Sequence, residues 1–454
     1  MSSASGAIAL VGIQDAPVLL NTTTISSTAA NITVTGPVIL ESSTPTFTAS
    51  SGNITFNDTI DGAFGLSATA SGTLSFLGNI GSTTPLTAFS TTASAYVLAG
   101  DITINNSAVN MSGGNVTLQS DVAISAGTSS VTFGGTVTGA YNFDITAATA
   151  GVFLGNNIST TTLAITPAVT LNGNVTLTTT SSSVVAMVLS SSVTGTNLNL
   201  TLAAGTGYIT LDSTVGLGSG TFTASTGTQV SFGGSVTAGA ISVAIPAVLT
   251  AGVTFSATST TATFSSTIDG DYALTISAAG VVTLGGALGG TTPLGSVSIS
   301  GSSLSLNQNI STNNSSISLA IPVTLTGDVV MNTGTVGGAI SFTNTITGAN
   351  NLTLDAGQSS TISFSSAVSG LSTLTLRNAN NITASSTISA TSIVQTYAAG
   401  TATYDGLLTT TGTFNLNGNA IAINGGINAS SGVILTHTGA LTLAGAVTLT
   451  GGTF

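Results

Sequence analysis

The chain has 454 residues and a formal net charge of −12, and only 3% of its residues are charged whereas 42% are hydrophobic. The chain contains one arginine, Arg377, and no lysine. It therefore cannot neutralise a phosphate backbone or an anionic membrane surface, and nucleic acid is excluded as a partner. The hydrophobic content excludes intrinsic disorder, and the lack of cysteine excludes disulfides and thiolate metal sites.

The N-terminal stretch MSSASGAIALVGIQ has no basic region, so it does not read as a signal peptide. No run of about 18 apolar residues occurs, and we therefore expect no membrane insertion. The composition is nevertheless that of a secreted surface protein. We expect an extracellular or cell-surface location, and a chain that is either mature or a piece of something longer.

One phrase recurs along the chain. It reads ITFNDTIDGAFGL at 54–66 and returns at 131–143, 262–274, 340–352 and 362–374. Apolar residues alternate in it with small polar ones, which is the period-two pattern of a β-strand. Thr, Val and Ile suit strands, and the Gly, Asn, Asp and Ser between them supply turns. The pattern predicts an all-β chain of short strands.

The spacing of the repeats indicates the architecture. The glycine that ends each phrase recurs at gaps close to multiples of about 19 residues. These glycines are Gly62, Gly139, Gly195, Gly270, Gly348 and Gly370. A second landmark, a proline before an apolar strand, keeps the same period at Pro167, Pro246 and Pro322. The period predicts coils of about 19–20 residues, grouped in super-repeats of about 77.

These coils predict one continuous β-solenoid over residues 1–454, a single long parallel β-helix. About 22 coils spaced by about 4.8 Å would extend over roughly 100 Å. The expected super-repeats span 37–114, a shortened 115–166, 167–245, 246–321 and 322–454. A string of sandwich domains would explain the longer period but not the shorter one.

In a solenoid the apolar residues of each phrase point inward, because a coil can bury them only against neighbouring coils. The expected inward pairs are Ile54 with Phe56, Val131 with Phe133, Ile340 with Phe342, and Ile362 with Phe364. The recurring glycines are expected at corners where φ is positive.

The phrases ITFNDTIDG and ATFSSTIDG, with VTLGGALGGTTPL at 282–294, resemble the repeats of filamentous-haemagglutinin-like adhesins and related β-strand-repeat proteins of bacteria. The resemblance covers roughly residues 30–450 and is one of repeat style. It implies a right-handed parallel β-helix that is exported to the cell surface and acts in adhesion, aggregation or biofilm. The NPN-type motif of the family's secretion domain is missing near the N-terminus.

Residues that could carry chemistry are few. His437 is the only histidine, and neither a catalytic triad nor a zinc site follows from it alone. Asp58 with Asp61, and Asp269 with Asp271, are the close carboxylate pairs. They are weak calcium candidates, a paired-carboxylate site for glycan cleavage, or, most simply, turn residues that cap their own backbone.

Sister phrases carry Thr138, Thr194 and Thr347 at the place of Asp61 and Asp269, which favours an interchangeable turn residue. We therefore expect no catalytic site, no cofactor and no dedicated metal site. Threonine-rich stretches such as 160–162 and 178–180 keep no common register, which argues against ice binding. The phenylalanines are expected in the core, and the tyrosines are expected to be partly exposed: Tyr96, Tyr141, Tyr208, Tyr272, Tyr397 and Tyr404.

The sequence thus predicts a non-enzymatic extracellular structural protein. Uncapped end coils expose strand edges, and the stretches Ala7–Leu20 and 440–454 are expected to pair between copies into head-to-tail filaments. The expected partners are the chain itself and a cell-surface glycan or protein. The alternatives are a passenger stalk of a larger secreted adhesin and a glycan-cleaving β-helix enzyme.

Overall fold

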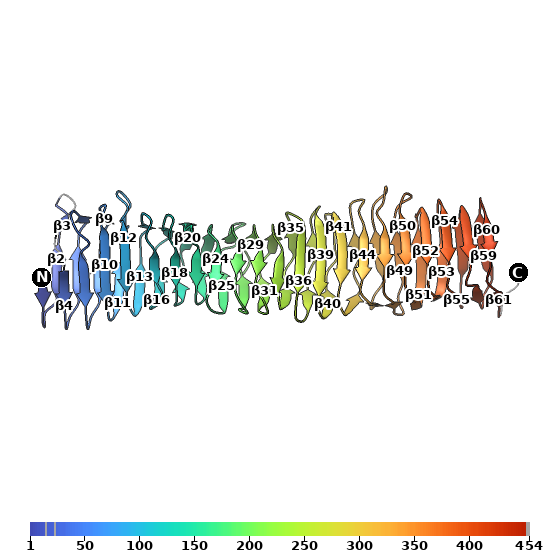
Figure 1. The fold of residues 1–454 in the computed structure, drawn as a ribbon, viewed down its shortest axis with the longest axis horizontal. Coiled ribbons are helices and arrows are strands. Elements are labelled where there is room, and N and C mark those ends of the chain that lie inside the picture. Colours follow the sequence, from blue (N-terminus) through green and yellow to red (C-terminus); the bar gives the residue numbers. More distant parts are fainter. Residues whose placement is uncertain (14–15, 22–23, 451–454) are drawn as a thin grey trace. The chain divides into compact units, whose positions relative to one another are not determined.

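The computed structural model describes residues 1–13, 16–21 and 24–450. Within these ranges every regular element is a β-strand, and the strands form parallel sheets wound into a β-solenoid of about 21 turns (Figure 1). The predicted all-β parallel β-helix is confirmed. In the same ranges there is no helix long and apolar enough to cross a membrane. The predicted end segments include residues 14–15 and 451–454, which lie outside the described ranges.

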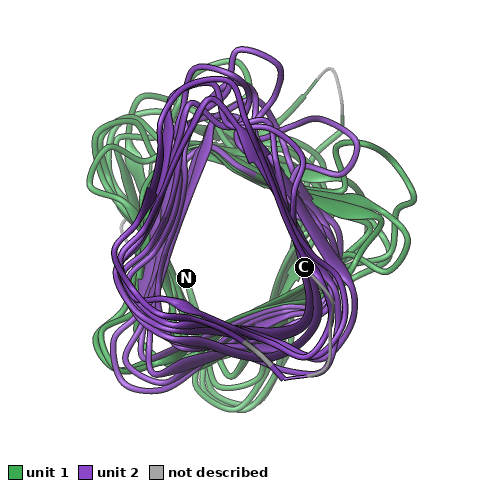
Figure 2. Ribbon diagram, turned by 90° about the vertical axis from the view of Figure 1, so that its right-hand side faces the viewer, with its two compact units in different colours: residues 1–231 green, residues 232–454 purple. Residues whose placement is uncertain are grey.

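The chain divides into two compact units, Met1–Ser231 and Phe232–Phe454, and each is a stack of three-strand coils. In the first unit a typical coil contains β8 (Ile54–Phe56), β9 (Ile60–Asp61) and β10 (Gly65–Ala70). In the second unit a typical coil contains β37 (Ala262–Phe264), β38 (Ile268–Asp269) and β39 (Ala273–Ala278). Seen end-on, the coils of the second unit trace a rounded triangle, with a strand position on each side (Figure 2).

Each strand pairs in parallel with its counterparts one coil before and one coil after. Coil length varies, from 17 residues between the partners Val152 and Val169 to 25 between Val175 and Leu200. The predicted 19–20 residues lie within this range, and 22 residues separate partners such as Ile32 and Ile54. The corner loops absorb the variation, because surface loops change length at little entropic cost. The super-repeat boundaries stay a prediction.

The predicted inward residues form the core. Ile54, Phe56 and their six counterparts are each 0–1% exposed. Pairing in register stacks identical residues of successive coils on one another. Phe342 in β47 (Ile340–Phe342) pairs with Phe364 in β50 (Thr361–Phe364), and the two rings have centroids 5.5 Å apart and an interplanar angle of 5°. Burying one such side chain contributes on the order of 2–3 kcal/mol, and the offset stacking of the rings adds to it.

The corner glycines follow the prediction in part. φ is positive at Gly62, Gly270, Gly348 and Gly370. A Cβ at Gly62 would collide with the carbonyl oxygen of Leu40 in the preceding coil, so only glycine fits there. The prediction is wrong at Gly139 and Gly195, whose φ is not positive. Their N–H groups continue the ladder instead, to Ser159 O at 3.1 Å and Gly216 O at 2.8 Å.

The tyrosines divide into two groups. Tyr141, Tyr272 and Tyr397 are exposed and Tyr208 is half-buried, as predicted, but the prediction is wrong for Tyr96 and Tyr404, which are 1% and 0% exposed. These two occupy inward positions that other coils fill with aliphatic residues. The hydroxyl of Tyr96 accepts a hydrogen bond from Ala93 N at 3.1 Å, which satisfies it inside the core.

Tyr404, in β54 (Thr401–Tyr404), donates to Oε1 of Gln395 at 2.6 Å, and Gln395 Nε2 donates to Asn417 O at 2.9 Å. Gln395 is 1% exposed. Burial raises the pKa of the Tyr404 hydroxyl well above its usual range, so it remains a donor. The small Ala384, which pairs with Tyr404 one coil earlier, leaves room for the ring.

Tyr404→Phe should lower the free energy of unfolding by about 1–3 kcal/mol, because Gln395 Oε1 would remain buried without a donor. Tyr141→Phe is the matched control, since its ring is exposed and its change should be nearly neutral. Guanidinium unfolding measures both. The double variant Gln395→Leu with Tyr404→Phe should recover part of the stability that Tyr404→Phe loses. Equal unfolding midpoints for Tyr404→Phe and Tyr141→Phe would contradict a stabilising hydrogen bond between Tyr404 and Gln395.

Candidate functional site

Asp61 and Asp269 occupy the same structural position in the two units. Each is the last residue of a short second strand, β9 or β38, and its Oδ1 reaches a loop of the next coil. Oδ1 of Asp61 accepts the N–H groups of Thr83 and Thr84 at 2.8 and 3.0 Å. Oδ1 of Asp269 accepts those of Thr291 and Thr292 at 2.8 and 3.2 Å.

The loop bonds back to the same corner. Gly62 N donates to Thr84 O at 3.2 Å, and Gly270 N donates to Thr292 O at 3.3 Å. The recurring TTPL segment is therefore the partner of the TIDG segment one coil earlier. A carboxylate that accepts two backbone donors fixes this loop, and we call the arrangement the Asp–loop clamp.

The neighbouring carboxylates do not join the clamp. Asp58 Oδ1 accepts the adjacent Thr59 N at 2.8 Å, the turn-capping geometry expected from sequence. Asp271 is exposed and accepts Asn313 Nδ2 at 3.2 Å. In the described ranges no three His, Cys, Asp or Glu side chains gather into a group that could hold a metal. The expected lack of a dedicated metal site, with Asp58, Asp61, Asp269 and Asp271 as weak calcium candidates, stays a prediction, and glycan cleavage stays an untested alternative.

The prediction that Thr138, Thr194 and Thr347 occupy the position of Asp61 is wrong. The recurring phrase does not lie on the same side of the coil in each repeat. Ile54–Phe56 forms a first strand, whereas Val131–Phe133 forms a third strand, β18, after β16 (Asn115–Leu118) and β17 (Val122–Ser125). Thr138 consequently lies on the next first strand, β19 (Val137–Thr138), at another corner. Alternation of apolar and polar residues predicts a strand, but it does not predict on which side of the triangular coil that strand lies.

His437 lies at the end of β59 (Val433–His437) and is exposed. Its Nδ1 lies 2.8 Å from Gly439 O, and a carbonyl can only accept, so Nδ1 donates. The ring is thus held by its own turn.

Asp144 is a carboxylate whose environment the sequence did not single out. Partial burial raises its pKa, and the negative charges of Asp121 and Asp101 raise it further. Those two carboxylates accept backbone N–H groups of the following coils, Asp101 from Ala123 at 2.8 Å and Asp121 from Asn142 at 2.9 Å. The three therefore form a column of like charge on one flank of the first unit.

The first and last coils leave part of the core uncovered. In the first unit β1 (Ser2–Ser3), β2 (Ile8–Val11) and β3 (Val18–Leu20) pair, within the part of the chain that the structure describes, only with strands of the following coil. We call these three strands the first layer. Its inward residues Leu10 and Val18 are half-buried, whereas their partners Val34 and Val38 are each 1% exposed.

The last layer consists of β59, β60 (Leu441–Leu443) and β61 (Val447–Leu449), which among the described residues pair only with the preceding coil. Leu441 and Leu443 are 36% and 47% exposed, although their partners Ile421 and Ile423 are 1% and 0% exposed. A hollow of about 330 Å³ opens here, lined by apolar residues alone: Ile427, Val433, Leu435, Leu443 and Val447. We call it the terminal cup.

Comparison of the chain with protein-family models, with curated proteins and with solved structures found no match. The resemblance to filamentous-haemagglutinin-like adhesins stays a prediction.

Asp269→Ala should lower the free energy of unfolding by about 1–2 kcal/mol, because two loop amides lose a charged acceptor that is only partly shielded from water. Asp269→Asn should retain most of the stability, since its amide oxygen still accepts. Asp271→Ala, two residues away, is the control and should change stability by less than about 0.5 kcal/mol. Denaturant unfolding measures all three, and equal losses at Asp269 and Asp271 would rule out the clamp.

Proposed function

We propose that this protein is a non-enzymatic structural β-helix of the extracellular surface, which docks head to tail with further copies of itself. The observation that carries the proposal is the terminal cup. Apolar side chains that are buried in earlier coils are open at the last layer, beside three strands whose outer edges have no partner among residues 1–13, 16–21 and 24–450. Exposed edges and apolar surface together favour pairing with another chain.

A second copy of this chain is the occupant that fits. Its first layer presents β1 for β60 and β2 for β61, according to the positions that these strands hold in their own ladders, and β3 lies on the side of β59 one coil further along. Leu10 and Val18 would cover Leu443 and its neighbours. The last layer has no acidic side chain and no lysine or arginine, so no charge opposes the contact.

A structural role agrees with where the polar groups lie. The carboxylates of the predicted pairs bond to backbone or amide groups, and the single histidine is held by its own turn. The remaining architecture consists of coils that hydrogen-bond to one another. The shaft of an adhesin and the subunit of a surface fibre share this mechanism, because both need coils stacked in series.

Sedimentation velocity tests the docking. The chain should form larger species as its concentration rises, and the effect should depend little on salt, because the layers carry almost no charge. Leu443→Lys should weaken association ~10-fold or more, since docking would bury an ammonium group without a partner. The side chain is 47% exposed before docking, so the fold should tolerate the change.

Val184→Lys is the matched control. Val184 is 67% exposed in the first unit, and the variant adds the same charge away from the layers. It should associate like the unaltered chain. Equal weakening in both lysine variants, or no association of the unaltered chain at any concentration, would reject the proposal.

A further inference from the structure

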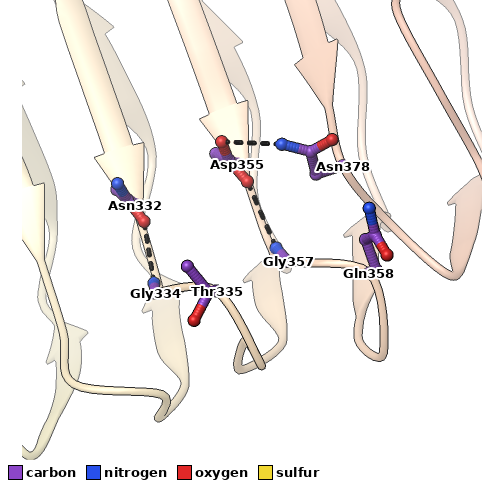
Figure 3. A pocket seen from close by; sticks show the side chains of 7 residues that line it. All are labelled: Asn332, Gly334, Thr335, Asp355, Gly357, Gln358 and Asn378. Carbon is purple, nitrogen blue, oxygen red and sulfur yellow. Dashed lines mark hydrogen bonds between the residues drawn. The ribbon is translucent and has the colours of Figure 1, made fainter.

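Two hollows lie over neighbouring strands of the second unit. The strands are β46 (Val329–Asn332), β49 (Leu352–Asp355) and β51 (Val368–Arg377), which pair in register. One hollow, of about 560 Å³, includes Asp328 and Asn351 near the beginning of these strands. The other, of about 370 Å³, lies at their ends and is lined by Asn332, Asp355, Asn378, Gln358, Thr335 and two glycines (Figure 3). No lining residue of the second hollow is apolar apart from these glycines.

The residues of the second hollow are held in place by short local bonds. Asn332 Oδ1 accepts Gly334 N at 2.7 Å, and Asp355 Oδ1 accepts Gly357 N at 3.2 Å. Asp355 Oδ2 accepts Asn378 Nδ2 at 3.2 Å (Figure 3). Asn378 and both glycines have positive φ, so the loops carry these groups in a defined turn.

Several polar groups remain without a partner within the described chain. Asn332 Nδ2 is a free donor, Asn378 Oδ1 is a free acceptor, and the exposed Gln358 amide offers both. We call Asn332, Asp355, Gln358 and Asn378 the amide site. Free donors and free acceptors lie on neighbouring coils there, and a ligand rich in hydroxyl groups can bond to both kinds.

A charge and an aromatic ring lie beside the amide site. Arg377, the chain's one guanidinium, pairs in register with Asp355, is exposed and makes no ion pair within the described residues. Ala379 pairs with Ala398, and its N–H donates to Tyr397 O at 3.4 Å, which puts Tyr397 next to Asn378 on the following coil. Tyr397 is 42% exposed, so its ring is open to a ligand.

We propose that the amide site, with Arg377 and Tyr397, binds a neutral oligosaccharide. Sugar hydroxyls both donate and accept, and they bond with amides, carboxylates and guanidinium groups, while an exposed tyrosine packs on the apolar face of a sugar ring. Asp328 and Asp355 outnumber Arg377. The two bonds that Asn351 donates to Asp328, at 2.9 Å each, lower the pKa of that carboxyl. An anionic sugar is disfavoured for this reason.

The surface between the two hollows is long enough for more than one sugar unit. The first strand, β46, extends over roughly 13 Å at ~3.3 Å per residue, and its two ends lie at the two hollows. An oligosaccharide of several units can therefore contact Asp328 and Asn351 at one end and the amide site at the other. A protein partner fits less well, because interface centres are apolar and aromatic and this surface is polar.

Saturation-transfer NMR with the full chain tests the proposal, with neutral tetrasaccharides of glucose, N-acetylglucosamine and mannose as probes and a uronic-acid tetramer beside them. At least one neutral probe should bind. Gln358→Ala and Tyr397→Ala should each weaken that binding about fivefold, the loss of roughly 1 kcal/mol of hydrogen bonding or ring contact. Gln119→Ala and Tyr272→Ala are matched exposed controls in other coils and should bind like the unaltered chain.

Three results would overturn the oligosaccharide site: no neutral probe binds, only the uronic-acid tetramer binds, or the site variants and their controls bind alike. The outcome is independent of docking between copies. The Leu443→Lys variant should bind the same probe unchanged, because Leu443 lies in the terminal cup and outside the amide site.

Discussion

The structure depends on one constraint: a coil can neither satisfy its backbone nor bury its apolar side chains except against the coils on either side of it. Equivalent positions therefore stack, as Phe342 does on Phe364. The same constraint explains why one phrase recurs through the sequence, since a change in one coil must suit both neighbours. It also makes the first and last layers different from every other part of the molecule.

The alternation of apolar and polar residues was enough to predict strands, coils, the parallel β-helix and the inward residues such as Ile54 and Phe56. It could not predict on which side of the coil a phrase lies, and so Thr138 was wrongly matched with Asp61. It also could not show that Tyr404 meets Gln395 inside the core, because residue 395 is polar and nine positions away. The amide site was missed for a similar reason: Asn332, Asp355 and Asn378 become neighbours only through the register of successive coils.

Polar side chains serve two purposes in this chain. Asp61 and Asp269 bind loop amides and so belong to the scaffold, which accounts for their place beside the recurring glycine. The amide site keeps donors and acceptors that the scaffold does not use, next to the single arginine. The flank of the second unit thereby offers a surface for a ligand, while the end layers offer surfaces for further copies. The two proposals therefore place docking between copies and glycan binding on separate surfaces.

Head-to-tail docking is the central claim, and electron microscopy of the purified chain over a range of concentrations tests it most directly. About 21 coils at a spacing of ~4.8 Å give an expected axial repeat of about 100 Å. Filaments with that repeat would mean that the last layer of one copy continues into the first layer of the next. Single particles at every concentration, or copies joined side by side, would contradict it.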